Sequence, residues 1–251
     1  LAFTDEELLE MAELRAMPAL LSEWRGYEVE ATDLLRARLR EIESDSPPSN
    51  LLLALLPADP GCLPALGDHL LTCPLSDFVT LRDLLRSHGD QLAPRFWQRW
   101  EQQSDERSVT LRLAAALALY DSQASKWGRH TDEVAQLIAL ESPLDLKAWI
   151  DAFRPLGAEL RPALRRLFQE NPESSEGEVA SAVLASYADG DLELLLDLLH
   201  LAEPRQLAPL VRQLRTMSRA ARPELERLLN NLEPPPPRQP LSRHRGVSYR
   251  F

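Results

Sequence analysis

Cysteine and histidine, the residue types most typical of zinc sites, are few in this chain. There are two cysteines and five histidines, and His69 lies four residues before Cys73. That spacing would place both side chains on one face of a helix. A zinc site needs four ligands, and no second pair stands at a matching spacing. We therefore expect no metal at this position, and we expect Cys62 and Cys73 to be buried thiols.

Carboxylates and serines are abundant, but their positions favour helix ends over catalysis. Asp132 and Glu133, or Asp189 and Asp191, are pairs of the kind used in general acid–base catalysis. Acidic residues at helix starts have a simpler role, because they accept hydrogen bonds from unpaired backbone N–H groups. No serine stands in a G-x-S-x-G elbow, and no G-x-G-x-x-G or Walker loop is present. The sequence therefore predicts no catalytic residue, no cofactor and no enzyme.

Arginine is the residue type whose positions most suggest a binding surface. Arginines cluster around three prolines, Pro94, Pro162 and Pro223. Stacked helices would align these clusters into a ridge, and guanidinium groups suit an acidic or phosphorylated peptide. The alternative is a solvated helix face with i, i+4 ion pairs to glutamate. The clustered arginines are Arg95, Arg99, Arg161, Arg165, Arg166, Arg219, Arg222 and Arg227; all but Arg219 are candidate partner-binding residues.

Tryptophan gives one further candidate for partner binding. Trp97 directly follows Phe96, and adjacent helical residues point in different directions. One of the two should therefore be less buried, and an exposed tryptophan can anchor an interface. We add Trp97 to the candidate partner-binding residues, with a tryptophan covering a seam between repeats as the alternative. Trp149 lies in the apolar stripe of its helix and is expected in the core.

The elements that must position these residues are helices. Leucine, alanine, arginine and glutamate dominate the composition, whereas glycine occurs nine times and aromatic residues make up 6%. These common residues favour helix, and the residues that favour strands are scarce. The predicted fold class is all-α.

Charge and hydropathy exclude some classes of partner. The net charge is −11, whereas nucleic-acid-binding proteins usually carry a basic surface. No apolar run approaches the ~20 residues that a membrane-spanning helix needs. We expect no nucleic acid and no membrane as partner, and two reduced thiols fit a cytoplasmic location.

Three segments of the chain resemble one another, at residues 73–100, 141–168 and 202–229. Each has an early proline, an apolar helical stripe, a short break, and a second helix entered at a proline. The prolines of the second helices, Pro94, Pro162 and Pro223, follow one another at similar intervals. Because proline is tolerated near a helix start, we expect each of these prolines to mark the same structural corner.

Alanine-rich helices separate these segments. Residues 111–121 and 179–189 match, with Tyr120 and Tyr187 within one position of each other, and residues 51–59 form a shorter version. Small side chains allow helices to approach closely, so we expect this helix to be the most buried of each unit. A unit then has about four helices, or two helical hairpins. The expected units are residues 50–110, 111–177 and 178–233.

The predicted architecture is a right-handed α-solenoid of stacked antiparallel hairpins, like HEAT and armadillo proteins. Residues 1–49 read as N-terminal capping helices, since terminal repeats are atypical. Residues 50–232 form the solenoid. Residues 233–251 include four consecutive prolines and read as an extended linker or tail.

Four segments resemble a particular family: LLLALLPADPGCLPALGDHLL, LRDLLRSHGDQLAPRFWQRW, LRLAAALALYD and LASYADGDLELLLDLL. They are similar to a helical region in large planctomycete-type bacterial proteins. Those proteins carry a serine/threonine kinase domain, this region, and often a domain like the formylglycine-generating (sulfatase-modifying) enzymes. The resemblance covers residues 13–232 and implies a HEAT-like module within a multidomain signalling protein. It brings no catalytic residue to this chain, which lacks the kinase Gly-rich loop, His-Arg-Asp and Asp-Phe-Gly motifs.

The predicted function is that of a non-catalytic scaffold that binds proteins or peptides, or neighbouring domains of its own chain. Extended helical stacks usually present such surfaces. One alternative is a rigid spacer between domains with no ligand of its own. Another is a HEAT-like enzyme acting on nucleic acid, which would need a positive groove that the overall charge opposes.

Overall fold

A computed structural model describes residues 14–17, 19–20, 28–42, 47–102, 106–188 and 190–217. Within these ranges all regular structure is helical and no strand occurs, which confirms the predicted all-α class. The acidic N-terminal residues 1–13 and the predicted tail at 233–251 lie outside the described residues.

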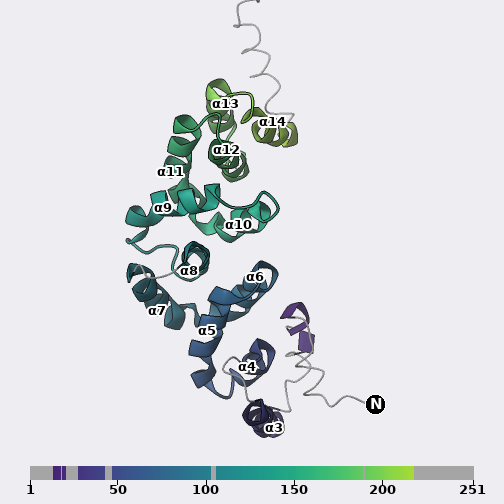
Figure 1. The fold of residues 1–251 in the computed structure, drawn as a ribbon. Coiled ribbons are helices and arrows are strands. Elements are labelled where there is room, and N and C mark those ends of the chain that lie inside the picture. The colour runs from purple at the N-terminus through teal and green to yellow at the C-terminus, as the bar shows by residue number, and fades with distance from the viewer. Residues whose placement is uncertain are drawn as a thin grey trace, which may run out of the picture.

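The α-helices follow one another closely along the chain (Figure 1). They are α3 (Glu28–Glu41), α4 (Ser49–Leu55), α5 (Leu63–Thr72), α6 (Leu75–Leu84), α7 (Gly89–Glu101), α8 (Arg107–Tyr120), α9 (Trp127–Ala139), α10 (Leu146–Ala152), α11 (Gly157–Glu170), α12 (Ser175–Tyr187), α13 (Leu192–Leu201) and α14 (Leu207–Thr216). The 3-10 helices are η1 (Leu14–Ala16), η2 (Pro60–Cys62), η3 (Leu85–His88) and η4 (Arg154–Leu156).

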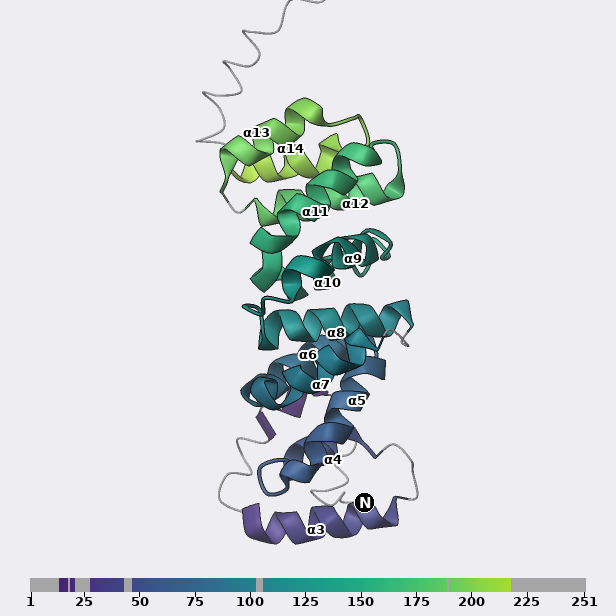
Figure 2. The ribbon, with the colours of Figure 1, turned by 90° about the vertical axis from the view of Figure 1, so that its left-hand side faces the viewer.

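The molecule is elongated, and the helices are stacked along its long axis from α3 at one end to α13 and α14 at the other (Figures 1 and 2). Most contacts join helices that are close in the sequence: α7 packs on α8, α9 on α11, and α12 on both α11 and α14. The core is therefore a continuous column rather than a single central cluster.

The alanine-rich helices lie inside this column. Ala114, Ala115, Ala116 and Ala118 of α8 are fully buried, and α8 contacts helices that precede and follow it. Their small side chains leave room for close helix approach on several sides of α8. In α12, Ala180, Val183 and Leu184 occupy comparable fully buried positions.

One arrangement occurs twice, at the ends of α8 and α12, and we call it the tyrosine clasp. Tyr120 at the end of α8 donates its hydroxyl to the carbonyl of Arg82 at 2.9 Å. Tyr187 at the end of α12 donates to the carbonyl of Ile150 at 3.0 Å. Each clasp therefore ties the end of an alanine-rich helix to a helix that precedes it in the chain.

The tyrosine rings of the clasps leave little space for a side chain opposite them. A Cβ on Gly89, the first residue of α7, would lie 3.1 Å from Tyr120. A Cβ on Gly157, the first residue of α11, would lie 3.4 Å from Tyr187. Glycine therefore stands where each helix begins against a ring.

Pro94 and Pro162 lie deeper in their helices than predicted, whereas Pro223 lies outside the described residues. Pro94 is inside α7 and Pro162 is inside α11, each five residues after the glycine that begins the helix. The prediction of a proline at the helix start was wrong because η3 and η4 lead directly into α7 and α11. Each proline therefore removes a hydrogen bond in the second turn.

Candidate partner-binding surface

The arginines of α7 make ion pairs with the preceding helix. Arg95 Nη2 lies 2.6 Å from Asp68 Oδ2 of α5, and Arg95 Nη1 donates to the carbonyl of Pro64 at 3.1 Å. Arg99 Nη1 lies 3.4 Å from Asp68 Oδ1. Both guanidinium groups are partly exposed, so these contacts fasten α7 to α5 at the surface.

The arginines of α11 make contacts in different directions. Arg161 donates to the carbonyl of Tyr187 and lies 3.6 Å from Asp191 Oδ2, between α12 and α13. Arg165 Nη2 lies 3.5 Å from Asp197 Oδ2 of α13. Arg166 forms an ion pair with Asp132 of α9.

The described arginines of α7 and α11 do not stand at one position relative to the repeated prolines, and the ridge of partner-binding arginines stays a prediction. Arg95 and Arg99 stand one and five residues after Pro94. In α11 the arginines stand one residue before Pro162 and three and four residues after it, so their side chains leave the helix at other angles. Each of these arginines has an ion pair with an aspartate outside its own helix. Arg219, Arg222 and Arg227 lie outside the described residues.

Trp97 and Phe96 are both buried, so Trp97 is not the exposed interface anchor that was considered for it. Trp97 is 4% exposed and Phe96 is 1% exposed. The indole Nε1 of Trp97 donates to Asp121 Oδ2 at 2.8 Å, in the segment between α8 and α9. The sequence reasoning considered only α7 itself, whereas the following segment covers Trp97. It is therefore not an exposed anchor, and the alternative of a seam-covering tryptophan describes it.

An aromatic cluster forms this seam between α7 and α9. Trp97 and Trp100 stack with ring centroids 5.5 Å apart, and Trp127 meets Trp97 edge-on at 5.0 Å. The centroid of the His130 ring lies 4.3 Å from that of Trp100, and Lys126 Nζ lies 5.4 Å from the centroid of the Trp97 ring.

Trp149 in α10 is buried in the core, as predicted.

The paired carboxylates have separate structural roles. Asp191 caps α13 by accepting a hydrogen bond from the N–H of Leu194 at 3.0 Å, as predicted for an acidic residue at a helix start. Asp132 and Glu133 are inside α9, so the capping role predicted for them is wrong. Asp132 binds Arg166, and Glu133 Oε2 lies 3.4 Å from His130 Nδ1. Asp189 is outside the described residues.

The two cysteines are buried, free thiols. Burial raises the pKa of Cys73 to about 11, and the Sγ atom donates to the carbonyl of Leu70 at 3.5 Å. Across the described ranges, no group of three or more histidine, cysteine, aspartate or glutamate residues is arranged to hold a metal ion. No helix in the same ranges is both long and apolar enough to cross a membrane.

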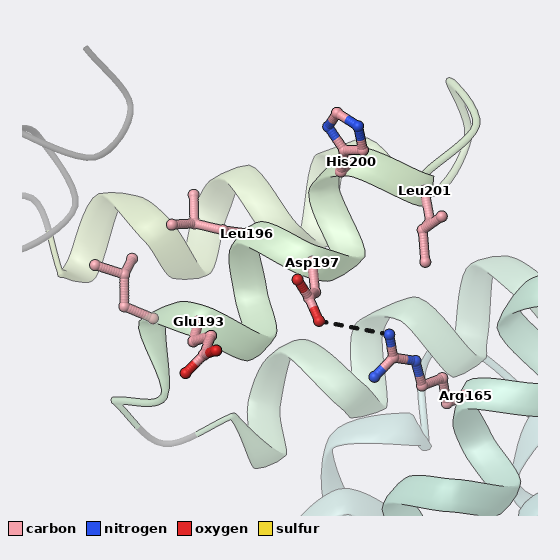
Figure 3. Close-up of a pocket in the computed structure, with 7 residues that line it drawn as sticks. Arg165, Glu193, Leu196, Asp197, His200 and Leu201 are labelled. Atoms are coloured by element: carbon pink, nitrogen blue, oxygen red, sulfur yellow. Dashed lines mark ion pairs between the residues drawn. The ribbon is translucent and has the colours of Figure 1, made fainter. Parts of the chain in front are cut away.

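A shallow open groove of about 750 Å³ lies along α13 (Figure 3). Arg165 of α11 forms one side, with its ion pair to Asp197, and α13 supplies the other residues. The groove combines partly exposed leucines with acidic and imidazole groups. Its lining residues are Arg165, Leu192, Glu193, Leu196, Asp197, His200 and Leu201.

Other exposed apolar side chains lie at the ends of two equivalent helices. Leu140 follows α9 and is 47% exposed, and Leu201 ends α13 and is 49% exposed. Their separation along the chain equals that of Pro162 and Pro223. Leu144, just before α10, is 92% exposed. Sequence reasoning missed these leucines because the periodic pattern does not distinguish the last apolar residue of a helix from a core residue.

Comparison with known proteins gives no relative from which a function could be transferred. No protein-family model matches the chain, and no match is found among curated proteins or solved structures.

Proposed function

We propose that this chain is a right-handed, HEAT-like α-solenoid that acts as a non-catalytic protein-binding scaffold. The observation that carries the proposal is the tyrosine clasp, in which Tyr120 and Tyr187 fasten equivalent helices at two successive levels. A junction that repeats in the same form generates a stack in which each unit contacts its neighbours. Such a stack exposes a long surface relative to its core.

The proposed contact surface is the exposed leucine edge, defined as Leu140 and Leu144, which lie between α9 and α10. A partner that covers these exposed leucine side chains removes their apolar surface from water. This burial favours binding by about 25 cal/mol for each Å² of apolar surface. The proposed partner is therefore a protein that presents apolar side chains to this edge. The arginines of α7 and α11 would serve it indirectly, since their ion pairs hold the helices that shape the surface.

The test is capture of a stoichiometric partner from the source cells by the full chain. Leu140→Glu with Leu144→Glu should abolish capture while the melting temperature stays within a few degrees. Arg129→Glu is the matched control, because Arg129 is exposed on α9 and its reversal makes the same change in net charge. Capture that survives in the double leucine variant would place the partner elsewhere. Absence of any stoichiometric partner would favour the rigid spacer.

The proposal extends to the setting of the chain, on the strength of the sequence resemblance described above. The module would then stand within a multidomain bacterial signalling protein, beside its own neighbouring domains. Two buried free thiols support a reducing cytoplasmic compartment.

A further inference from the structure

The leucine edge lies on a turn whose backbone is fixed by its own hydrogen bonds. This turn joins α9 to α10 near the middle of the stack (Figure 2). The N–H of Leu144 donates to Ser142 Oγ at 3.3 Å. The next two N–H groups both donate to the Ser142 carbonyl at 3.0 Å, and Pro143 has a fixed φ. A partner that covers Leu144 therefore meets a backbone that is already ordered, so binding costs little further chain entropy.

The two leucines of the edge are not needed to fill the core beside them. Leu137 and Ile138, in the last turn of α9, are 8% and 0% exposed. Leu140 directly after this helix is 47% exposed, and Leu144 is 92% exposed. The apolar face of α9 is thus already buried by its own residues, and the surface of the two leucines faces outward.

The side chains around the leucine edge are acidic. Residues 131–146 contain no lysine or arginine, and their four carboxylates belong to Asp132, Glu133, Glu141 and Asp145. Asp132 is paired with Arg166. Glu133 stands two helical turns before Leu140 on the same face of α9, and the ion pair that it forms within the described residues is with His130. Its carboxylate therefore has no lysine or arginine partner in that part of the chain.

Glu141 and Asp145 flank the two leucines along the chain and keep their negative charge. Glu141 Oε2 accepts a hydrogen bond from the neutral indole N–H of Trp149 at 3.2 Å. Asp145 is exposed directly before α10, and its side chain makes no capping hydrogen bond. The next basic residue, Lys147, is already paired, with its Nζ 2.6 Å from Asp151 Oδ2. The edge therefore combines exposed apolar surface with negative charge that no lysine or arginine of the described residues neutralises.

We infer that the partner at the leucine edge is a basic protein segment, whose apolar side chains cover Leu140 and Leu144 and whose lysine or arginine side chains pair with Glu133 and Asp145. This inference rests on the proposed function and names the chemistry of the partner. An acidic segment would meet like charges at this edge, as would an anionic lipid surface. An uncharged apolar segment would cover carboxylates without pairing them, which costs free energy. Charge complementarity therefore selects the basic segment.

Direct binding of two synthetic probes to the full chain tests the inference. Both probes are fluorophore-labelled amphipathic peptides of equal length, one made of leucine and lysine and the other of leucine and glutamate. The leucine–lysine peptide should bind, with an affinity that falls as salt is added, because salt screens exposed charges. The leucine–glutamate peptide should not bind. Equal affinity for the two probes would overturn the inference.

Two variants locate the binding at the leucine edge. Leu140→Ser with Leu144→Ser should weaken binding of the leucine–lysine peptide at least about tenfold, because apolar burial is lost. Glu133→Gln with Asp145→Asn should weaken it at least about threefold, because two exposed ion pairs are lost. Both variants should fold, with melting temperatures within a few degrees of the parent chain. Binding that survives in the serine variant would place the basic probe elsewhere and overturn the inference.

A second pair of neutralised carboxylates is the matched control for charge. Glu106 lies directly before α8 and, like Asp145, makes no capping hydrogen bond, and Glu193 lies in the first turn of α13; both are exposed. Glu106→Gln with Glu193→Gln makes the same change in net charge as Glu133→Gln with Asp145→Asn. This control should leave binding nearly unchanged. An equal loss in the two charge variants would show nonspecific attraction to an acidic protein and overturn the inference.

The outcome of this experiment is separate from capture of a partner from the source cells. Leucine-dependent capture without any preference for the basic probe would leave the proposed function standing and overturn this inference. Preference for the basic probe at the edge without a captured partner would support the inferred chemistry and count against the scaffold function.

Discussion

Gly177 in the first turn of α12 is the residue where a single methyl group should matter most. A Cβ there would overlap the carbonyl oxygen of Asn171, and the Gly177 N–H donates to Ser174 Oγ at 3.1 Å. We predict that Gly177→Ala lowers the free energy of unfolding by about 2–4 kcal/mol, since backbone must move.

Gly128 near the start of α9 provides the control for this prediction. It is exposed, and a Cβ on it would meet nothing within 4 Å. Gly128→Ala should therefore be neutral or raise stability by up to about 0.5 kcal/mol, because alanine favours helix. Urea unfolding of both variants measures the difference. Equal midpoints would show that α12 is not held against Asn171 as described.

Cys73 should be inert in the folded protein at pH 8. Its pKa is raised to about 11 by burial, so about 0.1% of it is thiolate at that pH. We predict no reaction with an aromatic disulfide reagent on the time scale in which Ser125→Cys, at an exposed position, reacts fully. Both native thiols should react once the chain is unfolded. Rapid native labelling of Cys73 would contradict its burial.

The same shift predicts how stability depends on pH. A group whose folded pKa is raised stabilises the fold fully below its unfolded pKa, and the contribution is lost as pH rises through the folded value. For Cys73 that window runs from about pH 9 to about pH 11. Burial also raises the pKa values of Tyr120 and Tyr187, which act in the same direction. The melting temperature should therefore fall as pH rises above 9.

At the scale of helices, the two tyrosine clasps should contribute equally to stability. Tyr120→Phe and Tyr187→Phe each remove one hydrogen bond to a backbone carbonyl and keep the ring. Each should lower the free energy of unfolding by about 1 kcal/mol. A cost in one variant only, measured by urea unfolding, would show that the junctions are not equivalent.

The helices and their order were largely predictable, because the periodic leucines and the matched positions of Tyr120 and Tyr187 depend on local sequence. The contacts that long polar side chains make with other helices could not be predicted from the sequence. Arginines of α11 reach three different parts of the chain, and that choice depends on where the neighbouring carboxylates lie in space. Gln206 shows the same limit: it is fully buried, donating to the carbonyl of Phe168 at 2.8 Å.

At the scale of the whole molecule, the alignment between units explains both what repeats and what differs. The shift that carries α7 onto α11 is nearly the same as the one that carries Tyr120 onto Tyr187. The shift from α9 to α13 is smaller, because the segment joining α12 to α13 is shorter than that joining α8 to α9 and α13 is itself shorter than α9. The spacing of the prolines was enough to align the units from sequence alone. The exposure of Leu144 and the α13 groove could not be predicted in this way, because both depend on how the helices are arranged in space.

Removal of one unit tests the central claim, that the chain is a stack of equivalent units. Deletion of residues 107–173 joins α7 to α12 in the register in which α7 now meets α8, with Tyr187 replacing Tyr120 against Gly89. Small-angle scattering and thermal unfolding should show a cooperatively folded protein whose longest dimension is shorter by roughly 20 Å, two helix layers of about 10 Å each. A shortened chain that fails to fold, or that folds without this loss of length, would contradict the account.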